Sequence, residues 1–293
     1  MKQISMILLL LSITFSAIGQ DEEPTGMPGD NFSLEGALEL LRQSSSVEDF
    51  EKKINAQDNH VNNLDLNEDG EIDYIKVISK KEDDIHIFIL QVPVSENENQ
   101  DIAVIELEKN GNNSAIIQIV GDEDVYGEEI IVEPSDEEDT DDGKSGVIHI
   151  DDFVVVNVWG WPAVRYVYGP TYRPWVSPWR WRVYPSYWSP WRPLGWSVWH
   201  PYRVTHYRPT VRIATTHRVV RAHSVYKPGR VTSTTVRTRH ATAKANYKVN
   251  RTRTKVTGPR GNSISKKTTT VRGAKGNVKA KKTTVKKGKK GND

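Results

Sequence analysis

Alternating oxygen-bearing residues in the segment 65–73 have the spacing of a metal-binding loop. The segment reads Asp-Leu-Asn-Glu-Asp-Gly-Glu-Ile-Asp, with a side-chain oxygen or a usable backbone carbonyl at every odd position. Gly70, at position six, permits the sharp turn that lets alternate side chains point inward. Because Ca²⁺ prefers oxygen ligands, the spacing predicts a structural calcium site. Its ligands would be Asp65, Asn67, Asp69, the carbonyl of Glu71, and Asp73.

This loop is similar to an EF-hand calcium loop but departs from it in two ways. Lys76 stands at position twelve, where an EF-hand supplies a bidentate glutamate, so moderate affinity is expected. The following segment, 72–78, reads as a strand and not as a helix. A nine-residue loop before a strand resembles the calcium loops of FG-GAP and VCBS-type repeats, although a single copy does not imply a propeller. The alternative interpretation is an ordinary hairpin turn at Asp69-Gly70.

Two helices and a run of short-linked strands are expected around this loop. Ser33 is a candidate N-cap for a helix with leucines on one face, and Ser46 and Asp49 form a capping-box pattern before a second helix. Segments rich in Ile and Val then predict strands at residues 72–79, 85–92, 102–108, 115–120 and 129–133. Helices followed by closely linked strands predict an α+β domain with a small antiparallel sheet, over residues 31–133.

The same region resembles an uncharacterised domain of proteins secreted by Gram-negative bacteria. The residues that carry the resemblance are Leu64–Asn67, Asp69–Ile75 and Leu90–Val94. The resemblance covers about a third of the chain and implies no activity.

A segment rich in Trp, Pro and Arg is expected at residues 147–205. All nine tryptophans lie between Trp159 and Trp199 among many prolines, and Ser-Pro-Trp-Arg occurs twice, at 177–180 and 189–192. Proline disfavours helix interiors and central strands, so an irregular segment is predicted. The aromatic side chains could enter a membrane interface, stack on sugars or nucleobases, or pack onto the acidic domain.

Charge divides the chain into two opposite halves. Residues 21–152 contain 37 acidic and 8 basic residues, whereas residues 153–293 contain 31 basic residues and one acidic residue. We expect an acidic linker at 134–146 and a disordered basic tail at 206–293, in which alternating Thr and Val could pair as strands on a partner. Dense Lys and Arg favour anionic partners such as lipopolysaccharide, extracellular DNA and anionic lipid, without sequence-specific nucleic acid recognition. The matched charges also suggest that the tail folds back on its own acidic domain or on that of a neighbouring chain.

The first 19 residues read as a signal peptide. Lys2 precedes an apolar stretch, and Ala17 and Gly19 suit a cleavage site. The stretch is shorter than the ~18 to 20 residues of a membrane-spanning helix, so a secreted, periplasmic or envelope location is expected. The chain contains no cysteine, which excludes disulfides and thiolate sites.

The eight histidines are dispersed, and the common catalytic motifs are missing from the sequence. We therefore predict a non-enzymatic exported envelope or surface-associated binding protein, with a calcium loop and a basic tail for anionic surfaces. The alternative is a secreted carbohydrate-binding or hydrolytic module that uses the tryptophans.

Overall fold

The structure is a computed structural model. It describes residues 24–135, 147–150, 153–207, 210–257, 263–272 and 278–288. The predicted signal peptide and nearly all of the predicted acidic linker lie outside the described residues.

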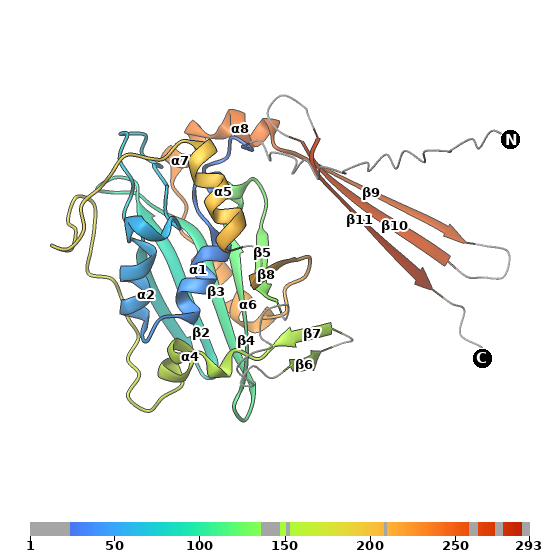
Figure 1. The fold of residues 1–293 in the computed structure, drawn as a ribbon, viewed down its shortest axis with the longest axis horizontal. Helices are drawn as coiled ribbons and strands as arrows, with labels where there is room; N and C mark the ends of the chain where they lie inside the picture. Colours follow the sequence, from blue (N-terminus) through green and yellow to red (C-terminus); the bar gives the residue numbers. More distant parts are fainter. Residues whose placement is uncertain are drawn as a thin grey trace, which may run out of the picture.

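A six-stranded antiparallel sheet forms the centre of the molecule (Figure 1). The strands run in the order β1-β2-β3-β4-β5-β8, and neighbouring strands up to β5 are also neighbours in sequence. The predicted α+β class and antiparallel sheet are confirmed. The bounds are β1 Lys76–Glu82, β2 Ile85–Pro93, β3 Asn99–Gly111, β4 Ser114–Gly121, β5 Ile130–Pro134 and β8 Val211–Ala214.

The two predicted N-terminal helices are present and begin at their predicted caps. The backbone N–H of Gly36 donates to Ser33 Oγ at 2.9 Å, and that of Asp49 donates to Ser46 Oγ at 3.1 Å. Each cap satisfies a backbone donor that the first turn leaves open. The helices are α1 Leu34–Arg42 and α2 Val47–Ile54.

Alternation along the strands gives the sheet two buried faces. Ile105 and Leu107 belong to the larger core cluster together with Leu38 and Phe50 of the helices. Val104, on the opposite face of β3, belongs to a smaller cluster with residues that follow position 211. Successive side chains of a strand point to opposite faces, so both faces of this sheet need a cover.

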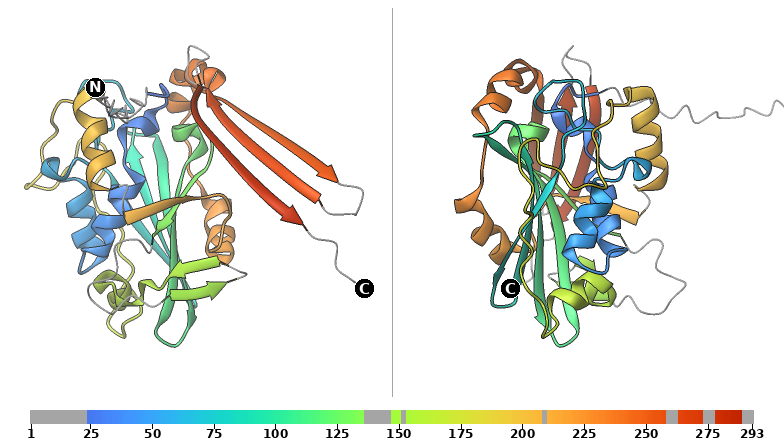
Figure 2. Two further views of the ribbon diagram at one scale, coloured as in Figure 1. Left: turned by 45° about the vertical axis from the view of Figure 1, so that its right-hand side comes forward. Right: turned by 90° about the vertical axis from the view of Figure 1, so that its left-hand side faces the viewer.

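These covers make a three-layer molecule (Figure 2). Helices α1, α2, α4 Pro162–Val167 and α5 Trp196–His206 lie on one face, and α6 Val220–Tyr226 lies on the other. The remaining elements are α3 Glu123–Tyr126, β6 Val147–Ile150, β7 Phe153–Val156, α7 Thr234–Arg239, α8 Ala241–Asn246 and the 3₁₀ turns Pro28–Asn31, Gln57–Asn59, Val158–Gly160 and Lys227–Gly229. The pair β6 and β7 forms its own two-stranded sheet.

The segment rich in Trp and Pro is irregular between α4 and α5, but the expectation that prolines exclude helices from it is wrong at both ends. Pro162 occupies the first turn of α4, where the missing N–H has no intrahelical partner to lose. Pro201 lies inside α5, where a proline costs about 3 kcal/mol. Burial of Trp199 offsets this cost: its ring is fully buried, and its Nε1–H donates to the carbonyl of Asp30 at 2.9 Å.

The prediction of a disordered tail from residue 206 is wrong for the next forty residues. Strand β8 pairs with β5, and helices α6, α7 and α8 follow it. The strands β9 Lys248–Thr257, β10 Ser263–Arg272 and β11 Val278–Gly288 then form a separate three-stranded antiparallel sheet (Figure 1). The low content of large apolar residues in this region is compensated in 210–247 by contacts with the acidic sheet.

The predicted boundary near residue 133 does not separate two independent units. The larger core cluster contains Val156, Trp161 and Val164 as well as Tyr207 and Val236, all packed with the N-terminal helices and strands. One hydrophobic core is therefore built from both charge halves of the chain.

Candidate functional site

The predicted calcium ligands lie on one tight turn between α2 and β1. The backbone N–H groups of Asp69 and Gly70 donate to the Asp65 carboxylate at 3.1 and 2.9 Å. Asn67 Oδ1 accepts from the N–H of Asp69 at 2.8 Å, and Asp69 Oδ1 accepts from the N–H of Glu71 at 3.0 Å. Gly70 has a φ of +84°, a conformation that favours glycine.

Asp73 closes this turn from inside the protein. Its side chain is buried, and its two oxygens accept from the N–H of Leu66 at 2.6 Å and from Asn67 Nδ2 at 3.0 Å. Burial, reinforced by the negative charges of Asp65 and Asp69, raises the pKa of Asp73 to about 7. A carboxylate held in such surroundings is stabilised by any nearby positive charge.

Two other parts of the chain reach this loop. Arg239 of α7 donates to the carbonyls of Leu66 and Asn67, and its Nε lies 3.9 Å from Glu68 Oε2. On the other side, the N–H of Ile72 donates to the carbonyl of Trp191 at 2.8 Å. The loop is therefore a junction between the acidic region, the aromatic segment and the basic region.

The loop brings the five predicted residues onto one turn, but its carboxylate oxygens do not meet at one point. A carboxylate oxygen that accepts one hydrogen bond keeps a second lone pair, so the donor set suits Ca²⁺ chemically. In the part of the chain that the structure describes, only one group of three acidic or histidine side chains has donor atoms within 4.8 Å of one another, and it is not in this loop. Calcium binding remains a prediction.

The sequence does not reveal a second set of buried polar residues, because their alternation with apolar residues is typical of an exposed strand face. Glu106 and Glu108 of β3, Gln118 of β4 and Glu133 of β5 alternate with apolar residues, as expected for a solvated side of a sheet. All four are buried. No local signal in the sequence shows that a segment a hundred residues later covers them.

The basic region pairs with these buried acids. Glu133 accepts from Arg212 Nε at 2.8 Å and from Arg218 Nε at 2.9 Å. Glu108 accepts from Arg221 Nε at 3.2 Å. We call residues 210–247 the basic cover, since their charged side chains neutralise the acidic sheet within the same chain.

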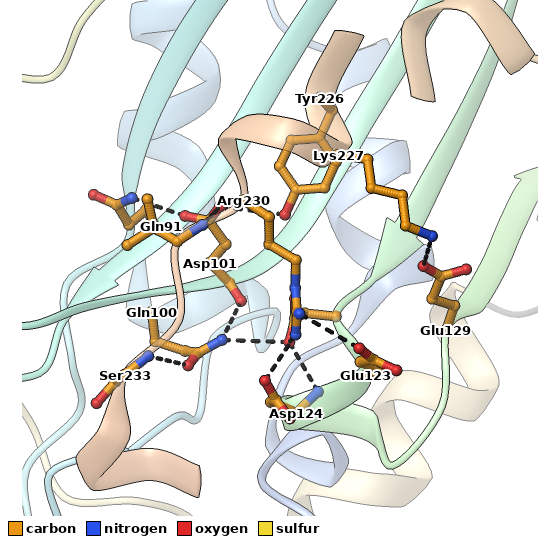
Figure 3. A network of polar contacts seen from close by, with 12 residues as sticks. Gln91, Gln100, Asp101, Glu123, Asp124, Glu129, Tyr226, Lys227, Arg230 and Ser233 are labelled. Atoms are coloured by element: carbon orange, nitrogen blue, oxygen red, sulfur yellow. Dashed lines mark hydrogen bonds and ion pairs between the residues drawn. The ribbon is translucent and has the colours of Figure 1, made fainter. Parts of the chain in front are cut away.

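Arg230 is the centre of the densest part of this interface (Figure 3). Its guanidinium makes two hydrogen bonds to the buried carboxylate of Asp122, one of them at 2.8 Å, and its Nη2 lies 2.8 Å from Asp124 Oδ2. Beside it, the buried carboxylate of Asp101 accepts from the N–H of Val231 at 2.8 Å and from the Tyr226 hydroxyl at 3.2 Å. Burial raises the pKa of Asp122 despite the hydrogen bonds from Arg230.

The aromatic segment is attached through Glu51, a buried carboxylate of α2. Glu51 accepts from Tyr74 Oη at 3.0 Å, from the N–H of Val77 at 2.8 Å, and from Trp175 Nε1 and Ser177 Oγ at 2.9 Å each. Four donors compensate the desolvation of this group, although burial still raises its pKa. The segment also pairs with the edge strand β1 through a bridge between Ile78 and Val176.

The tryptophans are all at least partly buried, and several pack against the domain or against one another. Trp161 and Trp199 are buried, and the other seven tryptophans are half-buried. Trp188 meets Tyr74 edge to face at a centroid distance of 5.0 Å. The arrangement favours the packing interpretation among the three that the sequence left open.

Comparison with known proteins gives no further guide, because no family model, curated protein or solved structure matches the chain. The resemblance to a secreted domain therefore remains a prediction. Among the described residues, no helix combines the length and the apolar character that crossing a membrane requires.

Proposed function

We propose that the protein is a non-enzymatic, exported binding protein of the cell envelope that attaches to anionic polymers or lipids through the strands β9–β11. The observation that carries the proposal is how the basic residues are divided. Those of the basic cover are largely occupied by acids of the sheet and of the first turn of α3. Residues 248–293 contain 16 Lys and Arg but only one acidic residue, Asp293.

A cationic segment of this density binds phosphate-bearing polymers by releasing their counterions. Lipopolysaccharide, extracellular DNA and anionic lipid share this chemistry, and none requires sequence recognition. The body would then serve as a support, and an anionic partner would be confined to β9–β11, because residues 21–247 contain 37 acidic but only 23 basic residues. The alternative of a sugar-binding or hydrolytic module has less support, because the tryptophans that it needs are engaged in packing.

The test compares two variants of the full chain that lose the same charge. The first replaces five lysines of β11 by Gln, and the second replaces five exposed arginines of the aromatic segment. Binding to a short duplex DNA, to lipopolysaccharide and to anionic vesicles is measured over a range of salt concentrations. The sets are Lys279, Lys281, Lys282, Lys286 and Lys287, and Arg165, Arg173, Arg180, Arg182 and Arg192.

We expect the β11 variant to lose about tenfold or more in affinity at moderate salt, with a salt dependence shallower by about 0.9 for each phosphate contact removed. The arginine variant should bind nearly as the parent does. Equal losses in both variants would refute the proposal and make the aromatic segment part of the binding surface.

We further propose that the loop at Asp65–Asp73 binds Ca²⁺ and connects α2 to β1. Support comes from the oxygen donors on one turn and from the buried carboxyl group of Asp73 that closes it. Calorimetric titration of the full chain should give calcium binding that is lost in Asp69→Ala. It should be retained in Asp83→Ala, which removes an exposed carboxylate from the turn between β1 and β2. Identical titrations for both variants would contradict the site.

A further inference from the structure

Two histidines of the basic cover lie beside two glutamates of the sheet region. His217 precedes α6 and His223 lies within it, whereas Glu106 belongs to β3 and Glu129 immediately precedes β5. The four residues come from distant parts of the chain, and the fold alone brings them together.

The side chains are already within short distances of one another. His223 Nδ1 lies 2.7 Å from Glu106 Oε1, and His217 Nε2 lies 3.3 Å from Glu129 Oε2. The two imidazole rings are 4.0 Å apart between centroids. One donor atom each from Glu106, His217 and His223 fall within 4.8 Å of one another.

Two donor atoms in this cluster lack a hydrogen-bond partner among the described residues. They are Oε2 of Glu106, a residue with no exposed surface, and Nδ1 of His217. Buried polar atoms in native proteins are nearly always paired, so two unpaired atoms in one cluster of ligating side chains indicate an additional ligand.

The charges around the cluster favour a cation. Glu106 and Glu129 bring two carboxylates to the cluster, and Glu106 is fully buried. The nearby Lys227 Nζ lies 3.6 Å from Glu129, on the more exposed side of the group.

We propose that Glu106, His217 and His223 form a binding site for a divalent transition-metal ion such as Zn²⁺, in which Glu129 orients His217 by holding its other ring nitrogen, Nε2. Two imidazoles and carboxylate oxygens suit borderline-soft ions, whereas Ca²⁺ takes oxygen ligands only. Tetrahedral ligands at about 2.0 to 2.1 Å from zinc lie about 3.3 Å apart, so a modest rotation of the partly exposed His217 closes the site.

Such an ion would join the central strand β3 to helix α6 directly. It would hold the basic cover on the sheet by coordination, in addition to the ion pairs of Glu108 and Glu133. The inference is independent of the calcium loop and of the anionic partner of β9–β11. The six-residue spacing of the two histidines matches no common metal motif, so the site cannot be recognised from the sequence.

The experiment is a calorimetric titration of the full chain with ZnCl₂, for the parent, His217→Gln and His223→Gln. His206→Gln, on the exposed side of α5, is the matched control. We expect one site in the parent, a loss of affinity of about tenfold to a hundredfold in the two test variants, and no change in the control. Excess Ca²⁺ should not compete.

A second measurement covers Glu106, whose substitution could also perturb folding. Circular dichroism first selects a folded Glu106→Gln sample, and the visible absorption of bound Co²⁺ is then compared with that of the parent. Loss of the tetrahedral Co²⁺ spectrum in folded Glu106→Gln and in His217→Gln supports the site. Zinc affinity and Co²⁺ spectra that are the same in all variants, or no zinc binding by the parent, would overturn it.

Discussion

His86 and Glu51 are both buried ionisable residues, but their surroundings differ. Glu51 has four hydrogen-bond donors. His86 has none at either ring nitrogen among the described residues, and it packs edge to face against Tyr168 and Tyr172 at centroid distances of 4.7 and 5.0 Å. Burial consequently lowers the pKa of His86 from 6.5 to about 4, since the charged ring would be unsolvated there.

This shift predicts a specific acid sensitivity. In the unfolded chain His86 takes up a proton near pH 6.5, whereas in the folded protein it does so only near pH 4. The unfolded state therefore binds more protons between these values, and the free energy of unfolding falls as the pH is lowered through that window. For this residue alone the fall amounts to about 2 kcal/mol between about pH 7 and about pH 5.

Urea unfolding of the parent and of His86→Leu at both pH values isolates this contribution. The parent should lose more stability on acidification than His86→Leu, because the variant has no ring to protonate. His206→Leu, which removes an exposed histidine, should behave like the parent. An equal acid response of the parent and His86→Leu would show that His86 is not held neutral by burial.

At the scale of the elements, Arg230 connects the segment after α6 to the first turn of α3. Replacing it by Gln leaves the buried carboxylate of Asp122 without its charged partner. We expect Arg230→Gln to lower the free energy of unfolding by about 2 to 3 kcal/mol, as measured in urea. Arg237→Gln, an exposed residue of α7, removes the same charge and should change stability by less than about 0.5 kcal/mol. Equal effects would mean that the network contributes nothing specific.

The elements that local pattern determines could be predicted from the sequence. Ser33 and Ser46 mark helix starts because capping is a contact between near neighbours. Strands β2, β4 and β5 were predicted within one or two residues, because alternation and turn residues define them locally. The first strand begins at Lys76 and not at Ile72, since the preceding residues complete the loop at Asp65–Asp73.

Elements that depend on distant partners could not be predicted. Strand β8 and helix α6 contain few large apolar residues. They are stable because their arginines pair with Glu108 and Glu133, which lie on the sheet. Helix α5 forms around Pro201 because Trp199 is buried by residues near Asp30. For the site, the sequence shows that Asp65–Asp73 is rich in oxygen donors, and calcium binding by this loop stays a prediction. The cluster at Glu106 depends on tertiary contacts alone.

At the scale of the whole molecule, both sheet faces depend on residues beyond position 145. A chain ending at residue 145 would expose Ile87, Ile89 and Val104, which the basic cover buries. It would also lack Trp161 and Val164 from the other face. We expect this fragment to aggregate or to bind a hydrophobic dye strongly. Circular dichroism, light scattering and dye fluorescence provide the measurements.

A chain ending at Tyr247 is the matched control, because it retains the basic cover and loses only the separate three-stranded sheet. It should remain monomeric and cooperatively folded. If the shorter fragment behaves equally well, the acidic half is an independent domain and the joint core has no energetic importance.

The late position of the sixth strand in the chain also determines when the sheet can be completed during synthesis. Strand β8 pairs with β5, yet 76 residues separate Pro134 from Val211, and α6 follows later still. A ribosome that adds about 5 to 20 residues per second exposes the strongly acidic portion for seconds before its counter-charged partner emerges. During this interval the strands that the basic cover later buries remain uncovered, so the nascent chain exposes the same apolar sheet face as the fragment that ends at residue 145.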